Sequence, residues 1–260
     1  MHLASGRSSG GSMMRWAWLF IFLVGGPGCD TEDPAALRWM VASSTAESAR
    51  QIADEFEQST GIAVEVIAAS SGSLVRQVEN GLQADVALLA SSQWMDRLEI
   101  LLPLVAETRR VPFGNRLVIA TRSRPTPREL ISLDGDPPAG RWVIGIPSSV
   151  PVGMHGKEAL QRLGWWEDVN PRAVRAANAR AAVSHVNSGS VDLGLIWASD
   201  TSTQCQILAE LPQQLTGAIT YPAARLSDRA GSQQLLEAIC DSPAWLAAGF
   251  TRPPSKESNR

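Results

Sequence analysis

The chain has 260 residues, of which 44% are hydrophobic and 19% charged, so it is long enough for one large domain or for two lobes with separate cores. Its formal net charge is -3 and its Lys and Arg residues form no basic cluster, which argues against a general polyanion binder such as a nucleic-acid-binding protein. It contains a single tyrosine, whereas a ferric-ion site needs several Tyr or carboxylate ligands.

The first 34 residues are predicted to be a signal segment and linker rather than part of the fold. Residues 1–12 are rich in Ser and Gly, and a basic residue after Met13 precedes a short apolar run. This run is shorter than the roughly 20 apolar residues that cross a membrane, so it indicates a secretory signal. The small residues before Cys29 resemble a bacterial lipoprotein signal, in which that cysteine is lipidated. Ordinary cleavage near the same place is the alternative.

Two further cysteines, Cys205 and Cys240, lie in the region predicted to fold. In an oxidising compartment they can pair as a disulfide or remain as two separate buried thiols, and the sequence leaves both possibilities open. Their spacing carries no metal-binding signature.

The first half of the chain alternates apolar runs of strand type with helical patterns. The predicted strands are 37–41, 62–67, 84–90 and 115–121, and the predicted helices are 45–60, 74–80 and 92–101. Small polar turns, 42–44 and 69–73, follow the first two strands. Because ligands bind at the carboxyl edge of parallel α/β sheets, these turns are candidate binding loops. Ser44 also fits a capping box with Glu47, so its hydroxyl has a purely structural alternative role.

The central stretch, 142–163, is predicted to be a strand, a Pro/Ser loop and a helix. Pro151 suits the first helical turn, because its missing N–H costs nothing there. The N–H groups of residues 152–154 would then lack intrahelical partners and could face an anion. Any βαβ unit needs such a turn, so a purely structural role is the alternative for this segment.

The remaining elements complete two predicted lobes. A helix at 179–188, a strand at 191–197, a returning segment at 218–223 and terminal helices at 232–240 and 243–250 follow in order. We assign 35–122 and 218–251 to lobe I and 123–217 to lobe II. The polar residues 252–260 are expected to be a disordered tail.

Several short motifs, in this order and at these intervals, resemble the periplasmic molybdate-binding proteins of bacterial ABC transporters, which are class II substrate-binding proteins. The motifs are Ala42-Ser43-Ser44, Ala69-Ser70-Ser71, Gln93-Trp94-Met95-Asp96, Gly114-Asn115-Arg116, Val150-Pro151-Val152-Gly153, Leu193 to Asp200, and Tyr221-Pro222. The resemblance covers about 37–250. It implies an α/β protein with two lobes, each a mostly parallel sheet flanked by helices, and a ligand in the cleft between them.

The resemblance also implies the site. The family binds a tetrahedral oxyanion through hydroxyl and backbone N–H donors, and its motifs place these at Ser44, Ser71, Val152 and Ala179. Where the family has a Tyr hydroxyl, this chain has Trp197, whose indole N–H can donate a hydrogen bond but cannot accept one. No metal bound directly by side chains and no cofactor is implied. The implied ligand is molybdate or tungstate.

The chemistry of these turns agrees with the resemblance. None of them places Arg or Lys at an expected ligand contact, so neutral donors and helix dipoles would hold the anion. Each such bond contributes about 1.5–3 kcal/mol, and together they favour a fully deprotonated anion such as molybdate, tungstate or sulfate. Phosphate retains a proton at neutral pH and needs an acceptor, for which Asp200 is the nearest carboxylate.

A different class of function, a hydrolase, would use Ser44 or Ser71 with His155 or His185 as base. No Gly-x-Ser-x-Gly elbow precedes a helix, so we expect a binding protein and no enzyme. A sensory domain of the same fold is disfavoured by the export signal. The expected protein is a periplasmic or envelope monomer that delivers the oxyanion to an inner-membrane ABC permease with its ATPase. It would bind no nucleic acid and would contact the membrane only through a lipid on Cys29.

Overall fold

The computed structural model describes residues 36–126 and 128–253. The predicted signal segment, the proposed lipidation site Cys29 and the end of the predicted tail lie outside these ranges. Among the residues described, no helix has the length and apolar character that crossing a membrane requires.

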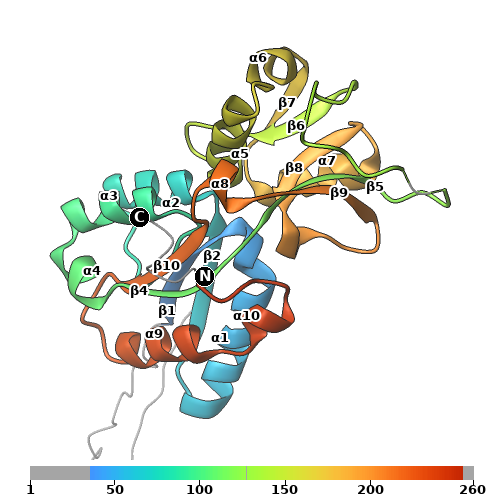
Figure 1. Cartoon of the computed structure of the whole chain (residues 1–260). Coiled ribbons are helices and arrows are strands. Elements are labelled where there is room, and N and C mark those ends of the chain that lie inside the picture. Colours follow the sequence, from blue (N-terminus) through green and yellow to red (C-terminus); the bar gives the residue numbers. More distant parts are fainter. Residues whose placement is uncertain (1–35, 127, 254–260) are drawn as a thin grey trace, which may run out of the picture. The chain divides into compact units, whose positions relative to one another are not determined.

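Two five-stranded sheets organise the chain, and Figure 1 shows each with its own helices. We call the elements around them lobe I and lobe II. Lobe I contains β1 (Leu37–Ala42), η1 (Ser43–Thr45), α1 (Ala46–Thr60), β2 (Val64–Ala69), α2 (Ser71–Glu79), β3 (Val86–Leu88), α3 (Ser92–Leu101), α4 (Pro103–Thr108), β4 (Arg110–Gly114), β10 (Thr220–Arg225), α9 (Ser232–Asp241) and α10 (Ala244–Ala247). Lobe II contains β5 (Leu117–Arg122), β6 (Trp142–Gly145), α5 (Pro151–Arg162), α6 (Trp166–Val169), η2 (Asn170–Arg172), β7 (Ala173–Ala176), α7 (Ala179–Ser188), β8 (Leu193–Trp197), η3 (Ala198–Asp200), β9 (Cys205–Leu211) and α8 (Gln213–Thr216).

The sheet of lobe I has the order β2-β1-β3-β10-β4. The first three strands run parallel, and β10 is antiparallel to both of its neighbours. Alternate residues of β1 enter different apolar clusters: Trp39 and Val41 pack with residues of α1 and α9, whereas Met40 packs with residues of α2, α3 and α4. This alternation follows from the period of two along a strand, so helices cover both faces of the sheet.

The sheet of lobe II has the order β7-β6-β8-β5-β9, with β6, β7 and β8 parallel and β5 antiparallel to both neighbours. Ile144 of β6 packs in the cluster that contains residues of α5, and Val143 packs in the cluster that contains residues of α7. The predicted α/β fold with two lobes is therefore confirmed.

The predicted boundary between the lobes differs from the observed sheets in one respect. We expected the strand near 115–121 to belong to lobe I, but β5 pairs with β8 and β9 in lobe II. The chain therefore crosses between Gly114 and Leu117, before β5, as Figure 1 shows. The strand is buried along almost its whole length, so its residue pattern indicates a central strand without indicating which sheet contains it.

The two cysteines of the folded region lie in different lobes and are both free. Cys205 begins β9 in lobe II, and its thiol donates to Asn187 Oδ1 at 2.9 Å. Cys240 lies in α9 of lobe I. Of the two possibilities that the sequence left open, the structure has separate thiols.

Candidate inter-lobe binding site

Four turns between a parallel strand and a following helix contain the predicted ligand donors. In lobe I, η1 follows β1 and α2 follows β2; in lobe II, α5 follows β6 and α7 follows β7. Each turn therefore lies at the carboxyl end of its strand, the edge at which α/β sheets bind ligands. The expectation for residues 152–154 is wrong in part, because the N–H groups of Gly153 and Met154 both donate to the Val150 carbonyl, at 2.9 and 3.0 Å.

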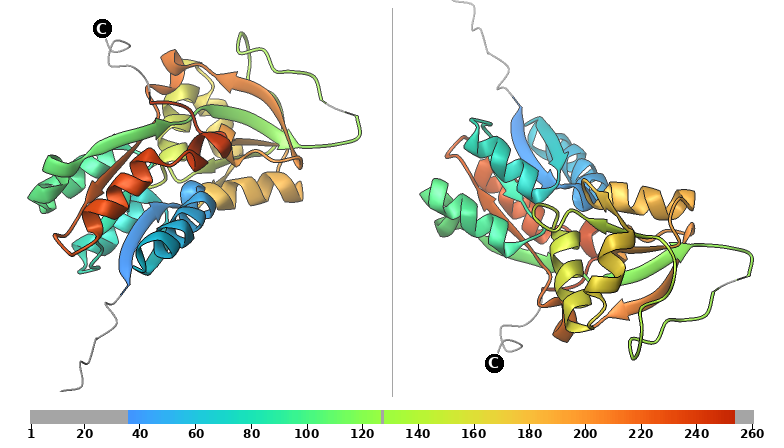
Figure 2. Two further views of the ribbon diagram at one scale, coloured as in Figure 1. Left: turned by 90° about the horizontal axis from the view of Figure 1, so that it is seen from below. Right: turned by 90° about the horizontal axis from the view of Figure 1, so that it is seen from above.

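Each turn of lobe I contacts a turn of lobe II. The N–H of Gly72, in the first turn of α2, donates to the carbonyl of Ser149 just before α5, at 3.1 Å. Arg180, in the first turn of α7, donates through Nε to the carbonyl of Ser43 in η1, at 3.0 Å. Both views of Figure 2 show α7 beside the start of α1. The structure thus brings the four predicted turns together in two pairs.

Ser44 lies in η1 and does not act as the predicted N-cap of α1. Thr45 occupies that position, and no side chain caps the helix. The hydroxyl of Ser44 instead lies 3.1 Å from the hydroxyl of Tyr221, in β10. The capping role, which the sequence offered as the structural alternative for Ser44, is not observed, because the chain inserts a short 3-10 turn before α1 begins. The hydroxyl of Ser44 is thereby directed at a long-range partner rather than at its own helix.

Tyr221 orients the Ser44 hydroxyl. Asn115 Nδ2 donates to Tyr221 Oη at 3.2 Å, and Asn115 Oδ1 accepts from the N–H of Arg116, which fixes the amide orientation. Burial and the charge of Asp200 raise the pKa of the Tyr221 phenol, so it remains protonated and can donate to Ser44 Oγ. The proton of the Ser44 hydroxyl is then available to another acceptor.

Ser71 is fully buried at the first position of α2, and Ser70 is the N-cap, accepting a hydrogen bond from the Ser73 N–H. The Oγ of Ser71 accepts a hydrogen bond from the N–H of Ala90 at 3.0 Å. Like Ser44, Ser71 can therefore receive a bond from the protein and still retain its own proton for an acceptor.

The two predicted backbone donors begin lobe II helices. Val152 is fully buried and follows Pro151, which occupies the first position of α5 as predicted. A Cβ on Gly153 would lie 2.0 Å from the carbonyl oxygen of Gly145, so only glycine allows this helix to approach β6 so closely. Ala179 begins α7, whose N-cap Asn178 accepts from the N–H of Ala181 at 2.9 Å.

Trp197 ends β8 and is only 1% exposed. Its ring makes edge contacts with His155 of α5, at 5.9 Å between centroids, and with Tyr221, at 6.4 Å. The large indole thus packs on the phenol that orients Ser44. This contact connects Trp197 to the donor network through Tyr221.

A cavity of about 620 Å³ opens between the lobes beside Ser44. Arg180 and Asp200 also line it, and the Oδ2 atom of Asp200 is buried without a hydrogen-bond partner. Burial raises the pKa of Asp200 to about 7, although the nearby Arg180 opposes the shift. Of the predicted site residues only Ser44 lines this cavity; Ser71, Val152, Ala179 and Trp197 do not.

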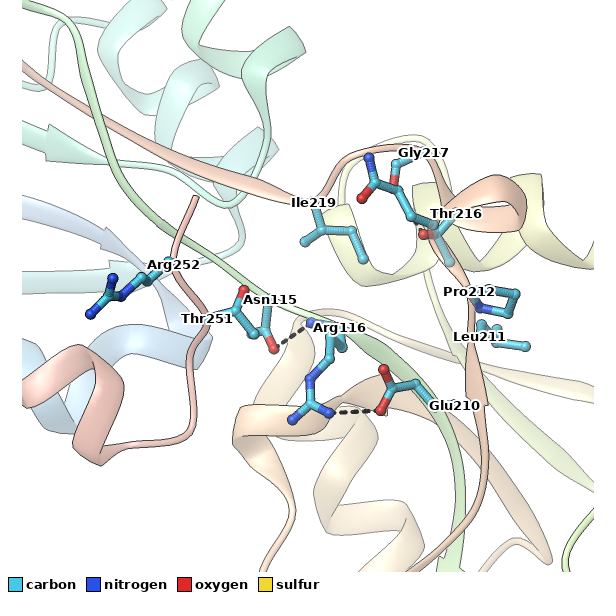
Figure 3. Close-up of a pocket in the computed structure, with 11 residues that line it drawn as sticks. Asn115, Arg116, Glu210, Leu211, Pro212, Thr216, Gly217, Ile219, Thr251 and Arg252 are labelled. Carbon is cyan, nitrogen blue, oxygen red and sulfur yellow. Dashed lines mark hydrogen bonds and ion pairs between the residues drawn. The ribbon is translucent and has the colours of Figure 1, made fainter. Parts of the chain in front are cut away.

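A second cavity, of about 300 Å³, lies where the chain passes between the lobes. Figure 3 shows Asn115 and Arg116 on one connection and Leu211 to Ile219 on the other, with the ion pair between Arg116 and Glu210 at 2.7 Å. Asn115 also donates to Ser199 Oγ at 2.8 Å. The residue that fixes Tyr221 is therefore part of the connection between the lobes.

The alternative hydrolase arrangement is not assembled. His155 Nδ1 lies 2.8 Å from the carbonyl of Thr216, to which it must donate, and burial lowers its pKa. His185 Nδ1 lies 2.9 Å from Ser190 Oγ. Across 36–126 and 128–253, no hydrogen bond joins Ser44 or Ser71 to either histidine.

Sequence reasoning missed the roles of Tyr221, Asn115 and Arg180. Tyr221 and Asn115 lie in motifs that carried the resemblance, but nothing in a motif indicates a contact with Ser44, 177 residues away from Tyr221. Arg180 directly follows the predicted donor Ala179. Its position in the first turn of a helix, where a cation opposes the helix dipole, was the available signal.

Comparison with known proteins identifies the family of the chain. Residues 37–241 match the family model of bacterial extracellular solute-binding proteins. The chain is 30% identical over 200 residues to the molybdate-binding protein ModA of Escherichia coli, covering 74% of this chain and 77% of that protein. It is 28% identical over 243 residues to the ModA protein of Haemophilus influenzae, covering 88% and 94% of the two chains.

A solved structure extends the comparison to the fold. The periplasmic molybdate-binding protein of Azotobacter vinelandii superposes with a TM-score of 0.71 at 22% identity, covering 84% of this chain and all of that one. With a family model that matches most of the folded residues, the chain belongs to the bacterial extracellular solute-binding proteins.

Proposed function

We propose that this protein binds a small tetrahedral oxyanion, molybdate or tungstate, between its lobes and passes it to an ABC permease. One observation carries the proposal: the hydroxyl oxygen of Ser71 accepts from a backbone N–H, and that of Ser44 lies 3.1 Å from the Tyr221 hydroxyl. Tyr221 is placed to donate to Ser44, and the Ala90 N–H donates to Ser71. Two hydroxyl protons thus remain for an acceptor, which suits an anion without protons of its own.

The proposed site has further donors in backbone N–H groups at Val152 and Ala179, and includes Trp197, which packs on His155 and Tyr221. Because Ser44 and Ser71 belong to lobe I and the other three site residues to lobe II, a bound anion would join the lobes. Ligand binding would then favour the closed arrangement over an open one. No metal, cofactor or catalytic group takes part in the proposed mechanism.

The ModA relatives support the choice of ligand, since both carry molybdate binding in their names. Membership in a family of extracellular solute-binding proteins supports export. We further propose a monomer in the periplasm or cell envelope, with Cys29 as a lipid anchor and an inner-membrane permease and its ATPase as partners.

Asp200 supports a second candidate ligand, a singly protonated oxyanion such as hydrogen phosphate. Its unpartnered Oδ2 lies in the wall of the cavity that Ser44 also lines. A carboxylate there could accept the proton that phosphate retains. The Asp200→Asn variant separates the candidates, because it would weaken phosphate binding and leave binding of a fully deprotonated anion in place.

Isothermal titration of the purified protein with molybdate, tungstate, sulfate and phosphate tests the proposal. We expect one-to-one binding of molybdate and tungstate and weaker binding of sulfate. Ser44→Ala should reduce affinity about 10- to 100-fold. The matched control is Ser59→Ala at the end of α1, whose hydroxyl bonds only to the Phe56 carbonyl. If none of the four anions releases heat or shifts the melting temperature, the proposed function is wrong.

A further inference from the structure

We propose that Arg180 is a positioning residue that holds lobe II against lobe I around the bound anion. This inference rests on the proposed function. It concerns a side chain that supplies no bond to the ligand and acts on the two turns that do.

The contacts of Arg180 cross between the lobes. Its Nε donates to the carbonyl of Ser43 at 3.0 Å, and its terminal nitrogen lies 3.7 Å from a carboxylate oxygen of Glu47. Within 36–126 and 128–253, this is the only ion pair that joins an element of lobe I to one of lobe II. Because the Glu47 side chain is 94% exposed, the bond to the carbonyl is the stronger of the two contacts.

The position of Arg180 in the sequence ties these contacts to the ligand donors. Arg180 follows Ala179, a proposed backbone donor, and its carbonyl partner Ser43 precedes Ser44, a proposed hydroxyl donor. One side chain therefore fixes the distance between a donor turn of each lobe. Because donors held at fixed positions need no further ordering when the anion binds, the entropic cost of binding is smaller.

The electrostatics of α7 also indicate a role other than helix stability. Arg180 lies in the first turn of this helix, where the positive end of the dipole disfavours a cation. Asp200 of η3 lines the same cavity, and the charge of Arg180 lowers its pKa against the larger effect of burial. Arg180 therefore occupies a position that is unfavourable for a cation within α7, and from this position its side chain contacts the other lobe.

Stopped-flow measurement of molybdate release, with tryptophan fluorescence as the signal, tests this role. We expect Arg180→Gln to raise the dissociation rate about 10-fold or more, because a charged hydrogen bond across the closed interface is lost. The association rate and the melting temperature of the ligand-free protein should change little. Arg180→Lys, which keeps a charged donor, should restore part of the slow release.

Arg97→Gln is the matched control, because Arg97 pairs with Glu79 inside lobe I. The inference is overturned if Arg180→Gln and Arg97→Gln release molybdate at the same rate. It is also overturned if the Arg180 variant changes only the association rate and the melting temperature, which would indicate a structural role.

A second measurement separates this inference from the proposed function. If the wild-type protein does not bind molybdate, the proposed function fails, and small-angle X-ray scattering of the ligand-free proteins then tests the contact alone. A larger radius of gyration for Arg180→Gln than for Arg97→Gln and wild type supports Arg180 as the residue that holds the lobes together. Equal radii overturn it.

Discussion

In the proposed site, the hydroxyl groups of Ser44 and Ser71 each combine a structural contact with a proposed contact to the anion. A serine that only bound an anion would have no partner inside the protein, but each of these oxygens lies beside an internal donor. An internal donor fixes the direction of the remaining O–H. Because the Ser71 hydroxyl accepts a hydrogen bond from the Ala90 N–H, its contribution to stability can be measured without ligand, separately from its proposed contact with the anion.

Ser71→Ala should destabilise the protein even without ligand. The variant leaves the N–H of Ala90 without its acceptor, and Ala90 is only 2% exposed. An unsatisfied buried donor costs about 1–3 kcal/mol, which urea unfolding would detect. Ser59→Ala, at the exposed end of α1, should change the free energy of unfolding by less than about 0.5 kcal/mol. Equal stabilities of Ser71→Ala and wild type would contradict the assigned bond.

Asp200→Asn should change how stability depends on pH. Burial raises the pKa of Asp200 from an ordinary 3.8 to about 7, so between these values the folded protein binds more protons than the unfolded chain. Stability therefore falls as pH rises through this window, by roughly 2 to 4 kcal/mol. The variant lacks this loss and should gain stability relative to wild type from pH 4 to pH 8.

The quantity to compare is the difference in the free energy of unfolding between Asp200→Asn and wild type at each pH. His155 has a lowered pKa, so its own contribution is lost as pH falls below its ordinary value of 6.5, in the opposite direction. It is present in both proteins and cancels. Arg180 is the charged group that opposes the Asp200 shift, and it is likewise unchanged. A difference that stays constant across the window would contradict the raised pKa.

At the residue scale, the sequence predicted positions better than contacts. Ser44 and Ser71 were located by motif, and the structure places both on the turns expected of them. The partners of these serines could not be predicted, because Tyr221 and Ala90 approach them only after the sheet has formed. The same limit explains why capping of its own helix remained an alternative role for Ser44.

At the scale of elements, α5 depends on close approach to β6. Val152, at the start of this helix, is fully buried. The next residue, Gly153, lies so close to the Gly145 carbonyl that there is no room for a side chain. The start of this helix, and with it a proposed anion donor, is therefore held against the strand by backbone contact.

Gly153→Ala should displace the start of α5. The new Cβ would lie 2.0 Å from a backbone oxygen, so the helix must shift, at a cost of about 3 kcal/mol, and molybdate affinity should fall with it. Gly156→Ala, in the same helix, is the matched control. Its Cβ would lie 2.9 Å from the Cδ1 end of Leu195, which can move.

For the control, the gain in helix propensity of about 1 kcal/mol offsets the contact, so stability and affinity should stay near wild type. Thermal unfolding and titration of both variants with molybdate measure the two effects. Equal losses in the two variants would show that the approach of α5 to β6 does not position the donor.

Helices were predictable where the spacing of apolar residues agreed with the residues that typically end a helix. The predicted helix at 179–188 ends at Gly189, which adopts a φ of 70°, as its position after the last helical residue indicates. The lobe to which β5 belongs was not predictable. Pairing with β8 and β9 depends on residues far along the chain, and β9 itself is only partly buried and gave no strand signal strong enough to assign.

At the scale of the whole molecule, two connections join the lobes. One runs from β4 to β5 through Asn115 and Arg116, and the other from β9 through α8 to β10. Opening and closing around a ligand requires that nothing covalent joins the lobes elsewhere. Among the residues that the structure describes, Cys205 and Cys240 are the only side chains that could form such a bond, which makes their state a test of the proposed hinge mechanism.

Cys205 and Cys240 should both be free in the purified protein. They lie in β9 of lobe II and α9 of lobe I, so a disulfide between them would tie the lobes and prevent opening. Alkylation in denaturant without reductant, followed by peptide mass spectrometry, should modify both residues. In the native protein the reaction at pH 7 should be slow, because burial raises the pKa of Cys240 to about 11 and also raises that of Cys205. Modification of these two residues only after reduction would mean that the lobes are covalently joined, and hinge closure would then be excluded as the mechanism of capture.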